Sequence, residues 1–403
     1  MSLNTATQKG GGIFSENSTV LLRHVALLSN TAGWTGGGIA VLNASAAVLN
    51  GTSTIASNVA ASGAGATVET FSTLSLTMAM VDRNVAAGNG GGVLTTHSSA
   101  SFFDSATTFS LNHGARGGGI SVQHQSSALF SGWVKFSANV ATTGDGGAAS
   151  VVGGSELGIH GSVSLVSNVA LTGLGGGASI AHSSKLTVFG NLSVESNAAN
   201  ESHGGGLDAS SNSTLNVSES GRLLVKRNTA AYGGGVALQS GSQMHCMGFS
   251  RIAQNMASHD GGGVHFSDGS ALALSTAKIY ANRANRDGGG IMASGVRFDL
   301  GSSDVEIISN EAGAYGGGIA VVDGLVTLVS KRMALQSNTA AWGGCVAASG
   351  RAAHISLGGD AVLLNCTALE DGGGAHLGGE STLNMTGSAQ ISTCAAINNG
   401  GGV

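Results

Sequence analysis

Two carboxylates, Asp260 and Asp287, stand at the same place before two successive glycine triplets of the sequence. If the segments that carry them stack at the spacing of paired β-strands, the two carboxyl groups would lie ~5 Å apart. Carboxyl groups at that distance suit retaining hydrolysis of a glycosidic bond, or the binding of a hard cation. Arg286 lies beside Asp287 and would offset its charge. Solvated turn residues are therefore the alternative interpretation.

Three aromatic residues, Tyr232, Tyr315 and Trp342, occupy the same place before other triplets. Exposed rings along a ridge of turns could stack on sugar rings or on a partner protein. Packing within the turns is the alternative. These aromatic residues and the charged residues above form the candidate binding set of the sequence.

Three of the four cysteines, Cys345, Cys366 and Cys394, fall near the end of the sequence. Cys366 follows Asn365, and Cys394 takes the place of that asparagine one repeat later. Stacked repeats would bring the Cα atoms of Cys366 and Cys394 into disulfide range, so we predict a bridge between them. Free core thiols are the alternative, because adjacent positions of a strand face opposite sides.

A repeat has to position all of these residues, and its first mark is a glycine triplet. Fifteen triplets or near-triplets follow one another at steps of 26 to 29 residues along the whole sequence. The near-triplets carry alanine or cysteine in one place, as in Gly343-Gly344-Cys345. So uniform a period indicates a repeat architecture.

The second mark of the repeat is an asparagine seven to nine residues before the end of each triplet except the last, where Cys394 stands instead. An aliphatic or aromatic residue stands three positions before it, and alanine usually stands two positions after it. In stacked repeats these amides would form an interior ladder, each bonding its neighbours and the backbone of the turn. The expected members are Asn30, Asn58, Asn84, Asn112, Asn139, Asn168, Asn197, Asn228, Asn255, Asn282, Asn310, Asn338 and Asn365.

The residues after each triplet alternate in polarity, as in Ile319-Ala320-Val321, and two more short alternations complete the repeat. This is the pattern of β-strands with one buried face. The sequence therefore predicts an all-β parallel β-helix with about 14 coils and three short strands per coil, continuous over residues 1–403. Glycine would allow the sharp turn between coils, where a Cβ atom would clash.

The composition excludes several classes of protein. Of the 403 residues, 68 are glycine, none is proline, and the net charge of −5 includes only 17 lysines and arginines. Without a basic block there is no electrostatic footprint for nucleic acid. Without a run of 18 apolar residues we expect no transmembrane helix. The first residues lack the features of a signal peptide and already read as part of a repeat, so we expect a fragment of a longer surface protein.

The combination of Gly-Gly-Gly-Ile, as at Gly316–Ile319, with an asparagine motif such as Phe109-Ser110-Leu111-Asn112 resembles the repeat of polymorphic outer membrane proteins. The resemblance covers essentially the whole chain, although most copies have an aliphatic residue where the family favours phenylalanine. It implies a right-handed β-helix of the pectin-lyase-like class, displayed on the cell surface, at the outer membrane or outside the cell. It also implies an adhesive role toward a receptor protein or glycan.

Three functions compete at this point. The leading hypothesis is a surface or secreted structural and adhesive β-solenoid, with no catalytic residues, no cofactor and no bound metal. The second is a polysaccharide-degrading or carbohydrate-binding β-helix with a site around Asp260 and Asp287, although the residue set shared by polygalacturonases is absent. The third, a calcium-dependent rod, lacks its Gly/Asp nonapeptide pattern.

Overall fold

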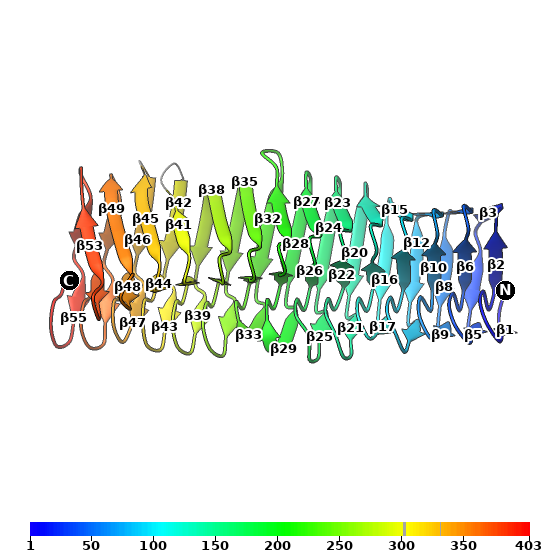
Figure 1. Ribbon diagram of the computed structural model, residues 1–403, viewed down its shortest axis with the longest axis horizontal. Helices are drawn as coiled ribbons and strands as arrows, with labels where there is room; N and C mark the ends of the chain where they lie inside the picture. Colours follow the sequence, from blue (N-terminus) through cyan, green and yellow to red (C-terminus); the bar gives the residue numbers. More distant parts are fainter. Residues whose placement is uncertain (301–303, 331) are drawn as a thin grey trace. The chain divides into compact units, whose positions relative to one another are not determined.

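The computed structural model describes residues 1–300, 304–330 and 332–403 (Figure 1). Contacts divide the chain into two compact units, Met1–Glu201 and Ser202–Val403, which we call unit 1 and unit 2. The described residues of both units form strands and turns and no helix. Each unit is a right-handed parallel β-helix, and the chain makes about 14 turns. The predicted fold is therefore confirmed, whereas one continuous domain over residues 1–403 stays a prediction.

One turn of unit 1 shows how the repeat builds the coil. It contains β6 (Ile39–Leu42), β7 (Ala46–Asn50), β8 (Ser53–Ala56) and β9 (Val59–Ala60). Each strand pairs in parallel with its equivalent in the next turn, so that Ile39 is opposite Ala66 and Val59 is opposite Val85. The turn thus has four strands instead of three, since a two-residue strand follows the asparagine. Its shortness explains why polarity alternation does not reveal it.

Unit 2 repeats this plan with two irregularities. The second and third strands of a turn run together in β35 (Gln243–Ala253) and in β38 (Ala271–Tyr280). Their pairing shifts register between Cys246 and Phe249. Beyond them, second strands form a separate small sheet: β41 (Arg297–Asp299), β45 (Leu325–Ser330), β49 (His354–Gly359) and β53 (Thr382–Met385).

The core of each unit is a set of columns in which equivalent side chains stack from turn to turn. In unit 1 the largest are Phe103, Phe109, Phe130 and Phe136, all fully buried. The rings of Phe109 and Phe136 are parallel, with their centroids 4.4 Å apart. Each such side chain contributes roughly 1.5–3 kcal/mol by leaving water. Stacking of like residues therefore stabilises the register that the repeat predicts.

The glycine triplets make a turn that folds back over the outer face of the next strand. The first glycine of every triplet has a positive φ, as at Gly288 with +65°. A Cβ atom at Gly288 would lie only 2.4 Å from the carbonyl oxygen of Ile291. At Gly261 it would lie 2.7 Å from the Cβ atom of His265. These contacts explain the triplets: the turn needs both the left-handed backbone and the missing side chain.

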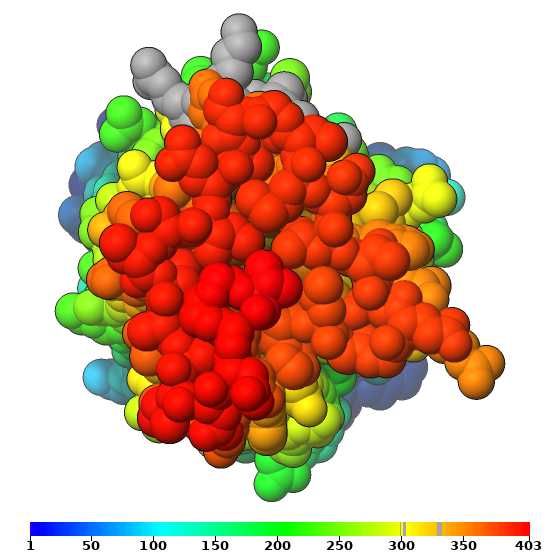
Figure 2. Space-filling model, turned by 90° about the vertical axis from the view of Figure 1, so that its left-hand side faces the viewer, coloured from blue at the N-terminus to red at the C-terminus, as the bar shows by residue number. Residues whose placement is uncertain are grey.

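The side chains and turns of the last coils cover the C-terminal end of unit 2, and the described residues leave no opening in this face (Figure 2). This agrees with a core of small aliphatic residues such as Val346 and Ala375, both fully buried. Among the described residues, no helix is long and apolar enough to cross a membrane.

Candidate functional site

The asparagine ladder is present in both units and is buried. Asn282 is typical: its Oδ1 accepts hydrogen bonds from the backbone N–H and the side-chain amide of Asn255, each at 3.0 Å. Its own amide donates to the carbonyl oxygen of Ile252 and to Oδ1 of Asn310, each at 3.0 Å. The members are Asn30, Asn58, Asn84, Asn112, Asn139, Asn168 and Asn197 in unit 1, and Asn228, Asn255, Asn282, Asn310 and Asn338 in unit 2. These twelve predictions are confirmed.

The prediction for Asn365 is wrong. Leu335 pairs with Leu363, which places Cys366 in the ladder column after Asn338. Asn365 is exposed and adopts a φ of +52°, like the residue before each ladder position. Asparagine tolerates this left-handed conformation better than most residues do. The motif misled because Val362 and Leu363 are both aliphatic, so the sequence fits two registers one residue apart.

The carboxylates of Asp260 and Asp287 lie on successive turns and bind the backbone. Oδ1 of Asp260 accepts a hydrogen bond from the N–H of Asp287 at 3.2 Å, and Oδ1 of Asp287 accepts one from the N–H of Tyr315 at 3.0 Å. Asp145 and Asp371 accept from the next turn in the same way. This recurring bond identifies a structural role for acidic residues at this position.

The electrostatics of the pair depend on its burial. Asp260 is buried, and its Oδ1 lies 3.7 Å from Nε of Arg286. Burial raises the pKa of Asp287, and the nearby charge of Asp260 raises it further. The N–H of Tyr315 and the charge of Arg286 oppose this rise. One member of the pair therefore has a raised pKa, as general acids do, although one oxygen of each carboxylate already accepts a backbone N–H.

The predicted aromatic residues stack along the same ridge of unit 2. The ring centroids of Tyr315 and Trp342 are 5.0 Å apart. Tyr232 stacks between His203, at 4.7 Å, and His259, at 5.0 Å. All five side chains are half-buried. The rings thus pack on one another in the turns, which is the alternative that the sequence left open, while part of each ring faces solvent.

Sequence reasoning missed His265, which lies on the outer face of β37 (Val264–Ser267). The glycine turn covers it, so only 8% of the residue is exposed, and its Nδ1 has no hydrogen-bond partner. Burial, followed by the neighbouring His203, lowers the pKa of His265 to about 4, while Asp268 opposes this. Alternation alone assigns the position to solvent, so the sequence carries no signal for this burial.

A surface hollow of about 470 Å³ lies over the turns of unit 1. Its walls include Phe71, which is exposed, and the stacked rings of His97 and His124, whose centroids are 4.9 Å apart. Nδ1 of His124 is 2.9 Å from the hydroxyl of Thr96. None of these residues bears the repeat marks, so the sequence did not single them out.

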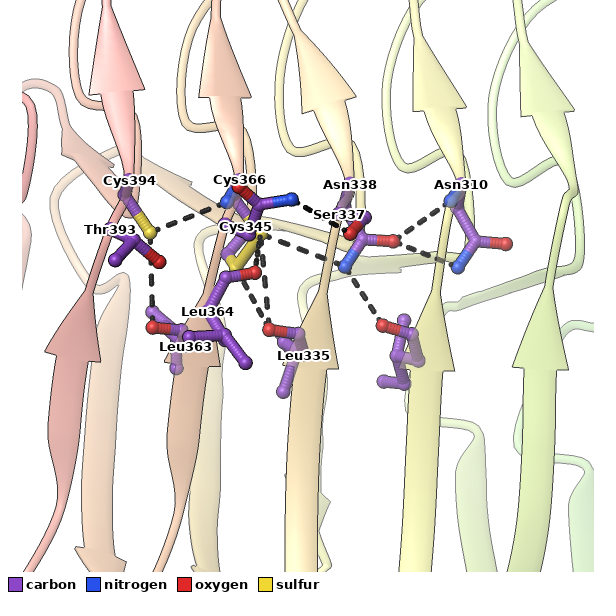
Figure 3. The surroundings of a disulfide bond; sticks show 12 residues. Asn310, Leu335, Ser337, Asn338, Cys345, Leu363, Leu364, Cys366, Thr393 and Cys394 are labelled. Atoms are coloured by element: carbon purple, nitrogen blue, oxygen red, sulfur yellow. Dashed lines mark hydrogen bonds between the residues drawn. A yellow bond between two sulfur atoms is a disulfide. The ribbon is translucent and has the colours of Figure 1, made fainter.

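The predicted disulfide between Cys366 and Cys394 is wrong, because the structure joins Cys345 to Cys366 (Figure 3). Their Cα atoms are 5.4 Å apart. Cys394 occupies the next ladder position, where its Sγ accepts the N–H of Cys366 at 3.4 Å. Cys246 is a free, buried thiol, and burial raises its pKa to about 11.

Comparisons with known proteins give no match among family models, curated proteins or solved structures. The function therefore has to be inferred from the fold and from the residues described above. Of these, the ridge from His203 to Trp342 and the cysteine cluster are the places where chemically versatile side chains gather.

Proposed function

We propose that this chain is a structural and adhesive β-solenoid, secreted or displayed on a cell surface, that binds a protein or glycan receptor and has no catalytic activity of its own. The observation that carries this proposal is the use of its polar side chains. The ladder asparagines and the ridge aspartates bond the backbone of neighbouring turns. The recurrent polar residues thus hold the coil together, and the variable side chains of the turns remain available for contacts.

Two further properties support the proposal. The repeat resembles that of polymorphic outer membrane proteins, whose β-helical segments are surface-displayed and often adhesive. The exposed turns also carry large apolar side chains that a binding surface can use, including Trp34, 55% exposed, and Phe71, 71% exposed. Aromatic side chains of this kind are enriched among the residues that dominate binding energy at interfaces.

A carbohydrate-binding or polysaccharide-degrading site on the ridge of unit 2 is the second candidate. The specific observation in its favour is the raised pKa of Asp287, which lies beside a second carboxylate. A general acid of a glycosidase requires such a raised value. In this alternative Asp260 and Asp287 would act on a sugar that stacks on Tyr232, Tyr315 or Trp342.

One experiment separates the two candidates. The purified chain is incubated with a panel of soluble polysaccharides, with new reducing ends as the readout, and its binding to cells and to a glycan array is measured in parallel. We expect saturable binding and no turnover. Turnover that is lost in Asp260→Asn, while the folded fraction is unchanged, would refute the adhesive proposal in favour of the enzyme. Absence of any binding or turnover would refute both.

A further inference from the structure

Three cysteines of unit 2 break the pattern of the repeat, and all three exceptions fall at one place in the fold (Figure 3). Cys345 replaces the third glycine of a triplet, while Cys366 and Cys394 replace asparagines of the ladder. Their Sγ atoms all lie within 4.8 Å of one another. Since a disulfide needs only two cysteines, the third requires an explanation of its own.

The geometry of the coil explains why these positions meet. At the third glycine of the preceding triplet, Gly318, a Cβ atom would lie 3.1 Å from the side-chain amide of Asn338. A side chain at this position therefore points at the ladder residue of the next turn. Cys345 reaches Cys366 in this way, across two different columns of the coil.

Cys394 reaches the same sulfur from another direction, because it continues the ladder column of Cys366. The backbone N–H of Cys366 donates to Sγ of Cys394 at 3.4 Å, as ladder N–H groups elsewhere donate to asparagine Oδ1. A hydrogen bond of this kind stabilises a thiolate, which is the nucleophile in disulfide exchange. Cys366 thus stands between two partners, one bonded and one free.

We propose that Cys345, Cys366 and Cys394 form a thiol–disulfide exchange site in which Cys366 is the shared sulfur. The thiolate of Cys394 attacks Sγ of Cys366, and a Cys366–Cys394 bond forms as the Cys345–Cys366 bond breaks. Cys345 leaves as a thiolate and takes up the proton that Cys394 gave to solvent. One disulfide and one thiol exist before and after the step, so it consumes no oxidant and no reductant.

The exchange changes which thiol can be modified. Cys394 is half-buried, whereas Cys345 is fully buried and lies 3.3 Å from the carbonyl oxygen of Leu335. With the Cys345–Cys366 bridge closed, the free thiol is open to a thiol-bearing or electrophilic partner. With the Cys366–Cys394 bridge closed, the free thiol lies inside the coil. The site therefore has a reactive and a protected state.

Mapping of the disulfides by mass spectrometry tests the proposal. The oxidised 403-residue protein is held at mildly alkaline pH, and the exchange is then quenched with acid. Free thiols are alkylated at that acidic pH before the protein is digested. We expect peptides with both bridges in the wild-type protein, and only the Cys345–Cys366 peptide in Cys394→Ser. In Cys345→Ser we expect the Cys366–Cys394 bridge to form in its place. Cys246→Ser is the matched control and leaves the wild-type distribution unchanged.

Two outcomes of the disulfide mapping would overturn the proposal. One is a wild-type protein that holds only the Cys345–Cys366 bridge at every pH while Cys394 is fully alkylated. The other is Cys345→Ser with free thiols at both remaining positions, although its unfolding midpoint shows that it is folded. Should the reduced protein instead take up one Cd²⁺ that the serine variants do not bind, the cluster would be a soft-metal site and not an exchange site.

Discussion

The backbone N–H of Asp287 donates to Oδ1 of Asp260 at 3.2 Å, so the first of these carboxylates is bound to the turn that carries the second. Asp287 repeats the contact with the N–H of Tyr315. The bond requires a side-chain oxygen at this place but not a negative charge. The sequence left two roles open for the pair: a catalytic or cation-binding role, which needs the charge, and a structural role in the turns. Substitution of each aspartate by asparagine therefore distinguishes them.

Asp287→Asn is expected to increase stability at neutral pH. Asparagine keeps an oxygen for the N–H of Tyr315 and removes a charge that burial and Asp260 disfavour. Because the folded-state pKa of Asp287 is raised, the advantage of asparagine should disappear as pH falls and the carboxyl becomes protonated. Asp287→Ala should instead lose about 1 kcal/mol, since the N–H of Tyr315 loses its partner. Urea unfolding at pH 7 and pH 4 measures both effects, and a less stable Asp287→Asn at pH 7 would contradict this account.

Acid should destabilise unit 2 through His265. Its folded-state pKa of about 4 lies below the ordinary value of 6.5, so the unfolded state binds the proton more tightly. Stability should be constant above pH 6.5 and fall between pH 6.5 and pH 4, by roughly 3 kcal/mol in total. The groups that face His265 are His203, Tyr232 and Asp268. Thermal unfolding across this range should show a smaller decline in His265→Gln than in the exposed control His245→Gln.

Removing one ladder amide should be among the most damaging changes in unit 2. Asn282→Ala leaves the backbone N–H of Asn255, the side-chain amide of Asn255 and the carbonyl of Ile252 without the bonds that the Asn282 side chain makes. With each unsatisfied buried group costing about 1–3 kcal/mol, we expect a loss on the order of 3–5 kcal/mol. The exposed Asn285→Ala serves as control, with a change within about 0.5 kcal/mol. Similar urea midpoints for the two variants would show that the ladder does not stabilise the coil.

A comparison of two glycines with similar φ values distinguishes backbone strain from a steric clash of the added Cβ atom. Gly288 and Gly269 have φ values of +65° and +73°. A Cβ atom would meet the backbone of Ile291 at the first, and nothing within 4 Å at the second. Gly269→Ala should cost about 1–2 kcal/mol, the strain of the left-handed conformation alone. Gly288→Ala should cost clearly more, because the turn must move as well; equal melting temperatures would refute the clash.

The sequence alone was sufficient to predict the structural features that recur from repeat to repeat. Ladder residues such as Asn282 recur in most coils and the glycine turns recur in all of them, so periodicity locates them, except where Cys366 takes the place predicted for Asn365. What it could not predict are the contacts between different columns. The partner of Cys366 is the third residue of a triplet, which no period relates to the ladder. His265 looks solvent-facing by alternation, and only the fold of the glycine turn over its strand buries it.

The disulfide between Cys345 and Cys366 also has a mechanical consequence. If the two ends of unit 2 were pulled apart along its axis, its coils would unfold one at a time, because the hydrogen bonds between turns lie parallel to that axis. The bridge joins residues separated by 21 positions. The segment between them could therefore not extend under load until the disulfide is reduced. If Cys366 were bonded to Cys394 instead of Cys345, a different segment, spanning 28 positions, could not extend. The two bridges would thus give the same chain two different extensions under load.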